Sequence, residues 1–270
     1  MRLYPLLLLP LAACGSLSMA AEPRVLVAPY LAVYQLRGEL AMQNDPGTGP
    51  VDNQSQRLRD LGQGQHQEDI GVRVDFGDGF GGLRVDYLHL AMDPAGDGVL
   101  TDDFGQLLAG DVVSSSAKLD EVRALYLVPV WSERANLYQR PFDFKLALGG
   151  GLAHRDLGLH VVTPGGSRAQ SLHIDDDGVG CAGARFRAGW RSVQWDVDYT
   201  IAPGTSFGGD FDGVQHDLET RFTYTVPFQD VSLFAGYRYC KLPVDGTEGG
   251  LGFDGDLVVE GYFFGVTVSF

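Results

Sequence analysis

The end of the chain alternates in polarity and finishes on an aromatic residue. One face of this segment carries Tyr262, Phe264, Val266, Val268 and Phe270, and the other carries Phe263, Gly265, Thr267 and Ser269. Because successive side chains of a strand point to opposite faces, the first face is apolar throughout. Glu260 is the next residue on that face. Ten residues of a tilted strand rise about 25 Å, close to the thickness of the apolar layer of a bilayer.

The same alternation recurs upstream and predicts about ten strands. The clearest apolar faces belong to Ile70, Val72, Val74 and Phe76, and to Val193, Trp195, Val197, Tyr199 and Ile201. We expect strands near 24–37, 68–76, 81–92, 119–131, 141–154, 177–189, 191–202, 214–226, 230–242 and 257–270. The predicted fold is all-β, a single antiparallel up-and-down barrel, with eight or twelve strands as alternatives. A secreted soluble β-sandwich is the main rival.

The connections between these strands alternate in length. Long gaps are expected at 38–67, 93–118, 155–176, 203–213 and 243–256, whereas the intervening gaps are short. Bacterial outer-membrane barrels have short periplasmic turns and long extracellular loops. With an even number of strands, every long gap lies on one side of the barrel.

The terminal strand resembles the C-terminal signature by which bacterial outer-membrane barrels are recognised for assembly. It is carried by Tyr262, Phe264, Val266, Val268 and Phe270. The chain is therefore similar to the outer-membrane β-barrel superfamily, without a narrower family. The resemblance implies location in the outer membrane of a Gram-negative-type bacterium. It also implies contact with outer-membrane lipids and lipopolysaccharide, and with the assembly machinery through the last strand.

The N-terminus predicts an export signal over residues 1–21, followed by the barrel over 22–270. Arg2 precedes an apolar stretch, and Ser18, Met19 and Ala20 form a small-x-small cleavage pattern before Ala21. The alternative is a lipoprotein signal, because Leu11, Ala12 and Ala13 precede Cys14, which would then be lipidated. Export favours a disulfide between Cys181 and Cys240. Their predicted positions three strands apart argue against it, because the Cα atoms would lie too far apart.

Charged residues occupy the strand faces opposite the apolar ones. In a membrane barrel these faces point into the lumen, where charges must be paired. We predict a lumen ion-pair network of Arg73, Asp75, Arg84, Asp86, Glu121, Arg123, Asp143, Lys145, Arg185, Arg187, Asp196, Asp198, Asp217, Glu219, Arg221 and Arg238. In a narrow barrel such pairs would fill the cross-section. The alternative is a path for protons or small ions.

Other classes of site are weakly represented. The net charge of −15 argues against nucleic acid. No Gly-x-Ser-x-Gly, Walker or zinc motif occurs, so no cofactor and no catalytic residue is predicted. The weak candidates for a metal site are Asp175, Asp176 and Asp177, which lack the later glutamate of a calcium loop.

Ten-stranded omptin proteases offer a comparison for a catalytic rim. They resemble this chain in architecture and carry an Asp pair and an Asp–His pair. Asp102 and Asp103 could imitate the first pair, and His216 with Asp212 is the nearest candidate for the second, without the tight spacing. The expected function is therefore a structural or surface-interaction barrel with acidic extracellular loops. A narrow channel and a rim hydrolase are the alternatives.

Overall fold

A computed structural model of the protein describes residues 24–46, 51–137, 140–175, 178–203, 210 and 213–270. The predicted signal peptide and Cys14 lie outside these residues. The described part of the chain contains no helix long and apolar enough to cross a membrane. Its elements are β1 (Arg24–Met42), β2 (Gln56–Arg57), the 3-10 helix η1 (Leu58–Leu61), β3 (Gln67–Gly77), β4 (Gly82–Met92), β5 (Gly98–Val99), β6 (Val112–Leu137), β7 (Arg140–Val162), β8 (Ala169–Asp175), β9 (Val179–Trp190), β10 (Val193–Ala202), β11 (Gln215–Thr225), β12 (Val231–Glu248) and β13 (Leu251–Ser269).

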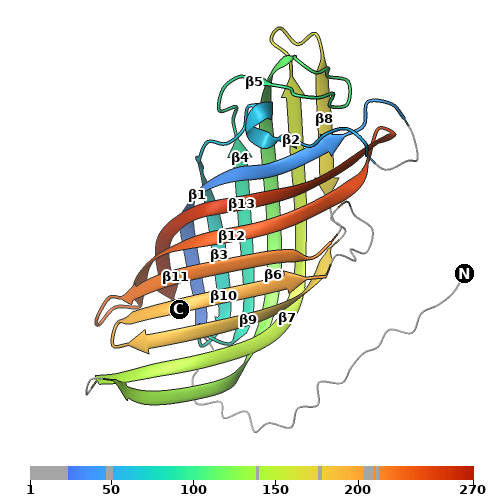
Figure 1. Ribbon diagram of the computed structural model, residues 1–270. Helices are drawn as coiled ribbons and strands as arrows, with labels where there is room; N and C mark the ends of the chain where they lie inside the picture. Colours follow the sequence, from blue (N-terminus) through green and yellow to red (C-terminus); the bar gives the residue numbers. More distant parts are fainter. Residues whose placement is uncertain (1–23, 47–50, 138–139, 176–177, 204–209, 211–212) are drawn as a thin grey trace, which may run out of the picture.

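The long strands form one closed antiparallel barrel (Figure 1). Neighbours in the chain are neighbours in the sheet, and β13 returns to pair with β1, placing Phe264 opposite Leu31. β8 and β9 both pair with β7, one above the other, and together occupy one strand position of the barrel wall, which we call a stave. Counting them once and omitting the short β2 and β5 leaves ten staves. The predicted up-and-down barrel of about ten strands is confirmed.

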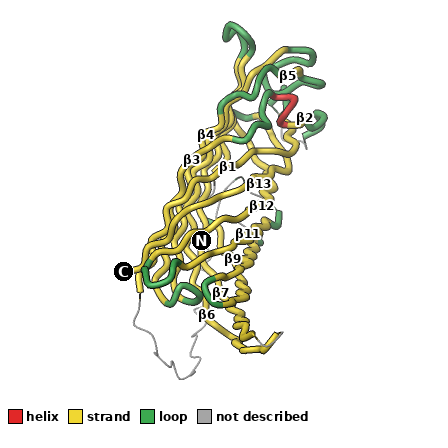
Figure 2. The backbone as a smooth tube through the Cα atoms, turned by 90° about the vertical axis from the view of Figure 1, so that its left-hand side faces the viewer, coloured by secondary structure: helices red, strands yellow, loops and turns green. Residues whose placement is uncertain are grey.

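Several predicted extracellular loops are in fact strand. The gap expected at 155–176 forms the upper part of β7 together with β8, and the gap at 243–256 is the continuous β12–β13 hairpin. β6 likewise begins at Val112, within a gap expected to extend to residue 118. These segments were missed because their outward residues are polar or glycine, as in a loop. Figure 2 shows the strands continuing as a tall wall toward the end that carries β2 and β5.

The outer wall is apolar at membrane depth. Ile70 is 63% exposed, Phe222 59% and Tyr262 61%, values that a soluble protein would not show for so many large side chains on one continuous surface. Phe264, Val266 and Phe270 of the terminal strand are also exposed. The aromatic rings continue around the wall, since Trp195 stacks on Phe222 with ring centroids 6.1 Å apart. Apolar side chains facing outward identify this surface as the one that contacts lipid.

The upper interior is apolar, a feature that the alternation of the sequence does not reveal. Leu90, Leu119 and Leu159 point inward above the charged lumen and are buried. η1 and the loop after β5 close over them with Leu58, Leu61, Phe104 and Leu107. We call this region the apolar layer; its members include Leu36, Leu40, Met42, Leu58, Leu61, Leu90, Phe104, Leu107, Leu119, Leu159, Leu172 and Phe253. The barrel therefore has a packed hydrophobic core above its charged segment.

Candidate functional site in the barrel lumen

The charged lumen begins near the short turns with a three-residue cluster. Asp196 of β10 accepts hydrogen bonds from Arg187 of β9 at 2.6 Å and from Arg221 of β11 at 2.9 Å. Arg187 also donates to the backbone carbonyl of Gly79 at 2.9 Å, which ties it to the β3–β4 turn. One carboxylate thus joins two guanidiniums from its two neighbouring strands.

A second cluster lies beside it and crosses the lumen. Arg84 of β4 pairs with Asp75 of β3 at 2.7 Å and with Asp198 of β10 at 2.9 Å. Arg185 pairs with the same Asp198 at 2.5 Å and donates to the carbonyl of Phe80 at 3.0 Å. Because β4 and β10 lie on different sides of the barrel, the Arg84–Asp198 pair spans its cross-section.

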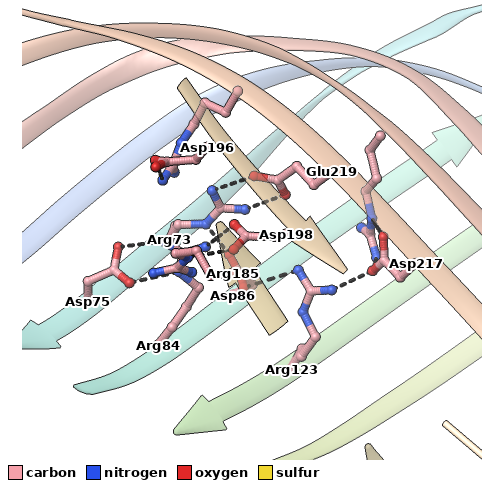
Figure 3. Close-up of polar contacts among 12 residues, drawn as sticks. Arg73, Asp75, Arg84, Asp86, Arg123, Arg185, Asp196, Asp198, Asp217 and Glu219 are labelled. Atoms are coloured by element: carbon pink, nitrogen blue, oxygen red, sulfur yellow. Dashed lines mark hydrogen bonds and ion pairs between the residues drawn. The ribbon is translucent and has the colours of Figure 1, made fainter. Parts of the chain in front are cut away.

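A third cluster also joins opposite walls (Figure 3). Arg73 of β3 makes two parallel hydrogen bonds to Glu219 of β11, at 2.8 and 2.7 Å, and also pairs with Asp86. Arg123 of β6 bridges Asp86, at 3.3 Å, to Asp217 of β11. Bidentate arginine–carboxylate geometry is both strong and directionally specific.

The chain of pairs continues upward to its highest members. Arg238 of β12 binds Asp217 at 2.7 Å and Glu121 of β6 at 2.6 Å. Arg155 of β7 then binds Glu121 at 3.0 Å and donates to the side chain of Gln215. From Glu219 to Gln215 the side chains form one continuous hydrogen-bonded series across the lumen.

Burial shows how tightly the lumen is filled. Arg84 and Arg185 are 2% exposed and Glu121 is 2% exposed, so hardly any water-sized space remains beside them. Charges so deeply buried are tolerated only when they are paired and hydrogen-bonded. Each charge of the network has at least one partner of opposite sign on a neighbouring strand or across the lumen, although the Nε–H groups of Arg123 and Arg221 have no hydrogen-bond partner among the described residues.

Two residues of the predicted network lie outside it, and one member of the observed network was not predicted. Asp143 pairs instead with Arg134 at 2.7 Å on the exposed β6–β7 hairpin, below the network. Lys145 lies with its ammonium 5.6 Å from the centre of the Phe80 ring. Strand parity predicts both residues in the network, because parity alone does not show where the lumen ends. Arg155 was missed, because it fell within a predicted loop that is strand.

Cys181 and Cys240 are free and buried. Cys181 belongs to β9 and Cys240 to β12, which are three staves apart. The structure shows the separation of three strands that the sequence predicts and that argues against a disulfide.

A belt of polar residues surrounds the outer wall immediately above the apolar surface. Glu260 pairs with Arg37 at 2.9 Å and accepts a hydrogen bond from Tyr237 at 2.8 Å. The other cross-strand pairs of this belt are His89–Asp120 at 2.7 Å, His216–Tyr199 at 2.7 Å and Lys241–Asp256 at 3.1 Å. A polar belt above an apolar wall is suited to lipid headgroups.

The candidate catalytic residues do not form a common site: Asp102 and Asp103 make hydrogen bonds within the loops, and His216 lies elsewhere. Asp102 accepts the backbone N–H groups of Gln54, at 2.8 Å, and of Asp103, at 2.9 Å, and these bonds lower the pKa of its carboxyl. Asp103 accepts the side-chain amide of Asn44 at 3.0 Å and the N–H of Ala109 at 2.8 Å. His216 lies on the outer wall against Tyr199, and its predicted partner Asp212 falls outside the described residues.

A metal site is likewise not assembled in the described part of the chain. No group of three or more His, Cys, Asp or Glu residues suitable for a metal ion occurs there. Asp176 and Asp177 lie outside the described residues, and only the backbone of Asp175 is described.

Comparisons with known proteins agree with this geometry. No protein-family model matches the sequence and no curated protein matches it significantly. Among solved structures, the outer membrane protease OmpT from Escherichia coli superposes with a TM-score of 0.56 at 8% identity, covering 93% of this chain and 99% of that one. The chain folds as an outer-membrane β-barrel.

Two further solved structures are similar to this barrel, with lower scores. The toluene transporter TodX of Pseudomonas putida gives a TM-score of 0.26 at 7% identity, covering 92% of this chain and 90% of that one. OccK7 of Pseudomonas aeruginosa gives 0.20 at 9% identity, covering 91% and 99%. The likeness to OmpT concerns the fold alone, so the role of the barrel has to come from its own residues.

Proposed function

We propose that this outer-membrane barrel has a closed lumen and acts through its extracellular surface, in a structural or surface-interaction role. The observation that supports it is that the interior is filled by side chains at two levels. The ion-pair network occupies the lower lumen, with Arg185 and Glu121 each 2% exposed, and the apolar layer lies above it. A conducting pore needs a continuous water-filled path, and both the ion-pair network and the apolar layer block such a path.

The lipids of the outer leaflet are the proposed surroundings of the polar belt. Arg37 and Lys241 project outward there, beside Glu260 and Asp256. Such mixed charges can interact with lipopolysaccharide phosphates directly and through divalent cations. The terminal strand, with Phe264 and Phe270 exposed, is proposed to engage the assembly machinery.

Single-channel recording tests the closed lumen. The purified barrel, refolded and inserted into planar bilayers, is expected to give no steady conductance steps. A variant with Arg73, Arg123 and Arg238 replaced by alanine provides the comparison, because it removes the side chains that cross the lumen. Steady currents through the unmodified protein would overturn the proposal.

Peptide hydrolysis is the competing function, because OmpT is a protease with a similar fold. A cleavage assay on the purified barrel, with alanine at Asp102, Asp103 and His216, distinguishes the two. We expect no cleavage above background in either protein. Cleavage that the three alanines abolish would favour a catalytic rim.

A further inference from the structure

The lower mouth of the barrel holds a cavity that the ion-pair network closes from above. Its volume is about 270 Å³. It opens at the end of the barrel with the short turns, which is the periplasmic end in outer-membrane barrels. Asp75, Asp196 and Arg221 line its deep part, and Arg24, Asp78 and Asp230 line its rim. We call this cavity the vestibule.

The wall of the vestibule carries an array of hydroxyl groups. They come from the inward faces of the last three staves, below the charged residues. The hydroxyl of Ser232 donates to that of Thr225 at 3.1 Å across two of these staves. The full set is Thr223, Thr225, Ser232, Thr267 and Ser269. Hydroxyls can donate or accept, so this wall can adapt to a polar guest.

One buried donor at the deep end of this wall has no hydrogen-bond partner among the described residues. Arg221 is 6% exposed and uses Nη2 for Asp196, at 2.9 Å. Its Nε–H is buried and has no hydrogen-bond partner among the described residues. A guanidinium can bind an oxyanion through Nε and Nη2, and because Nη2 of Arg221 is already bound to Asp196, the Nε–H is the donor left on that edge. Because Arg221 is one of the residues that line the vestibule, an acceptor bound in its deep part is the group that we expect to satisfy this donor.

The charges around Arg221 favour an anion at depth. The carboxylates of the two lowest clusters are already paired: Asp75 with Arg84, Asp196 with Arg187 and Arg221, and Asp198 with Arg84 and Arg185. These clusters contain four guanidiniums and three carboxylates, although Arg84, Arg185 and Asp198 lie behind the lining of the vestibule. The charged residues of the rim are Arg24, Asp78 and Asp230, so the surplus of positive charge is confined to the deep end. At the rim, Asp78 is occupied by the N–H groups of Phe80 and Gly81, at 2.9 and 2.7 Å.

We propose that the vestibule is a periplasmic binding site for a small oxyanion. A carboxylate or phosphate group would accept the Nε–H of Arg221 and hydrogen bonds from Thr223 and Thr225. The volume lies below the range usual for drug-sized ligands, so the guest is a small metabolite or a single end group of a larger molecule. This site is independent of whether the lumen conducts.

Calorimetric titration of the detergent-refolded barrel tests the site with two probes, inorganic phosphate and acetate, against chloride at equal ionic strength. Saturable binding of either probe is expected. R221K keeps the charge and removes the planar fork, so we expect affinity to fall at least about tenfold. T223V is isosteric and neutral, and it should weaken binding less.

R123K is the matched control. Arg123 is also a buried network arginine with an unpartnered Nε, but it does not line the vestibule. Its replacement should leave the affinity unchanged, provided that heat-modifiable gel mobility shows a folded barrel. Absence of saturable binding of both probes, or equal affinity in R221K, overturns the proposal. If R221K fails to fold, the double variant T223V/T225V decides, because it alters no charge.

Discussion

At the scale of single residues, position in the barrel decides what an arginine contributes. Arg73 is 3% exposed and holds both Asp86 and Glu219 in the lumen. Arg37 is also paired, with Glu260, but its side chain is 59% exposed on the outer belt. The first makes a buried pair whose partners depend on it, and the second makes a screened surface pair.

Arg73→Met is expected to destabilise the barrel by about 3–5 kcal/mol, because two carboxylates lose a buried partner. Arg37→Met, the matched control, should cost less than about 1 kcal/mol. Glu260 would still accept hydrogen bonds from Gln35 and Tyr237. The measurement is the free energy of urea-induced unfolding from lipid vesicles. Equal costs at the two sites would show that the network is solvated.

Much of the lumen was predictable from the sequence at this scale. Alternation of apolar and charged residues identified Arg73, Asp86 and Glu219 as inward-facing, because strand parity is strict. The partners of each charge were harder to predict from the sequence. Arg73 and Glu219 are 146 positions apart and meet across the lumen, and no local pattern encodes such a contact. Lys145 and Asp143 were misassigned since parity does not define depth.

At the scale of elements, close approach of strands depends on small residues at particular points. Tyr30 of β1 turns inward over β3 at Gly71, where an added Cβ would lie 2.1 Å from the Tyr30 ring. The lumen wall on this side is therefore aromatic, with Tyr30 and Phe263 in edge contact at 5.8 Å. Strand existence was predicted well. Strand length was not, because apolar residues above the membrane face inward.

The terminal strand gives a prediction for assembly. Removal of Phe270 should lower the yield of heat-modifiable barrel in the outer membrane severalfold, because the aromatic end of the strand is the proposed recognition signal. Phe222→Ala is the control, since it removes an exposed ring of the same kind from β11. If both changes lower the yield equally, lost lipid contact explains the effect.

The loop between β5 and β6 should loosen in acid. The N–H groups of Gln54 and Asp103 lower the pKa of Asp102, so ionised Asp102 stabilises the loop. That stabilisation is present above the unfolded pKa and is lost as pH falls through the folded pKa. Asp102→Asn mimics the protonated form and should reduce the hydrogen-exchange protection of the Gln54 amide at neutral pH. Unchanged protection would contradict the assignment.

At the scale of the whole molecule, the barrel consists of two halves with different interiors. Ion pairs fill the interior of the membrane half, whose outer wall is apolar, and the apolar layer fills the interior of the extracellular half. The sequence indicated the first half through its charged strand faces. It concealed the second, because residues such as Leu159 and Leu172 come from segments that resemble glycine-rich loops.

The two halves should unfold separately. Leu40 is fully buried in the apolar layer, so Leu40→Asn should open the extracellular half to protease added to whole cells. The membrane half should remain as a protected, heat-modifiable fragment. Glu39→Asn, an exposed change at the neighbouring position, is the control. Simultaneous loss of both halves would show a single cooperative unit.

The change of interior is visible in the sequence pattern of two strands, β4 and β7. In β4 the apolar side chains occupy odd positions up to Tyr87 and even positions from Leu88 onward. In β7 they shift from even positions, ending at Leu152, to odd positions from Leu157. Such a phase reversal in the period-two pattern locates the water boundary of the outer leaflet along the chain. In barrels with this kind of interior, the depth of a residue in the membrane can therefore be inferred from the position at which the apolar residues change between odd and even numbers.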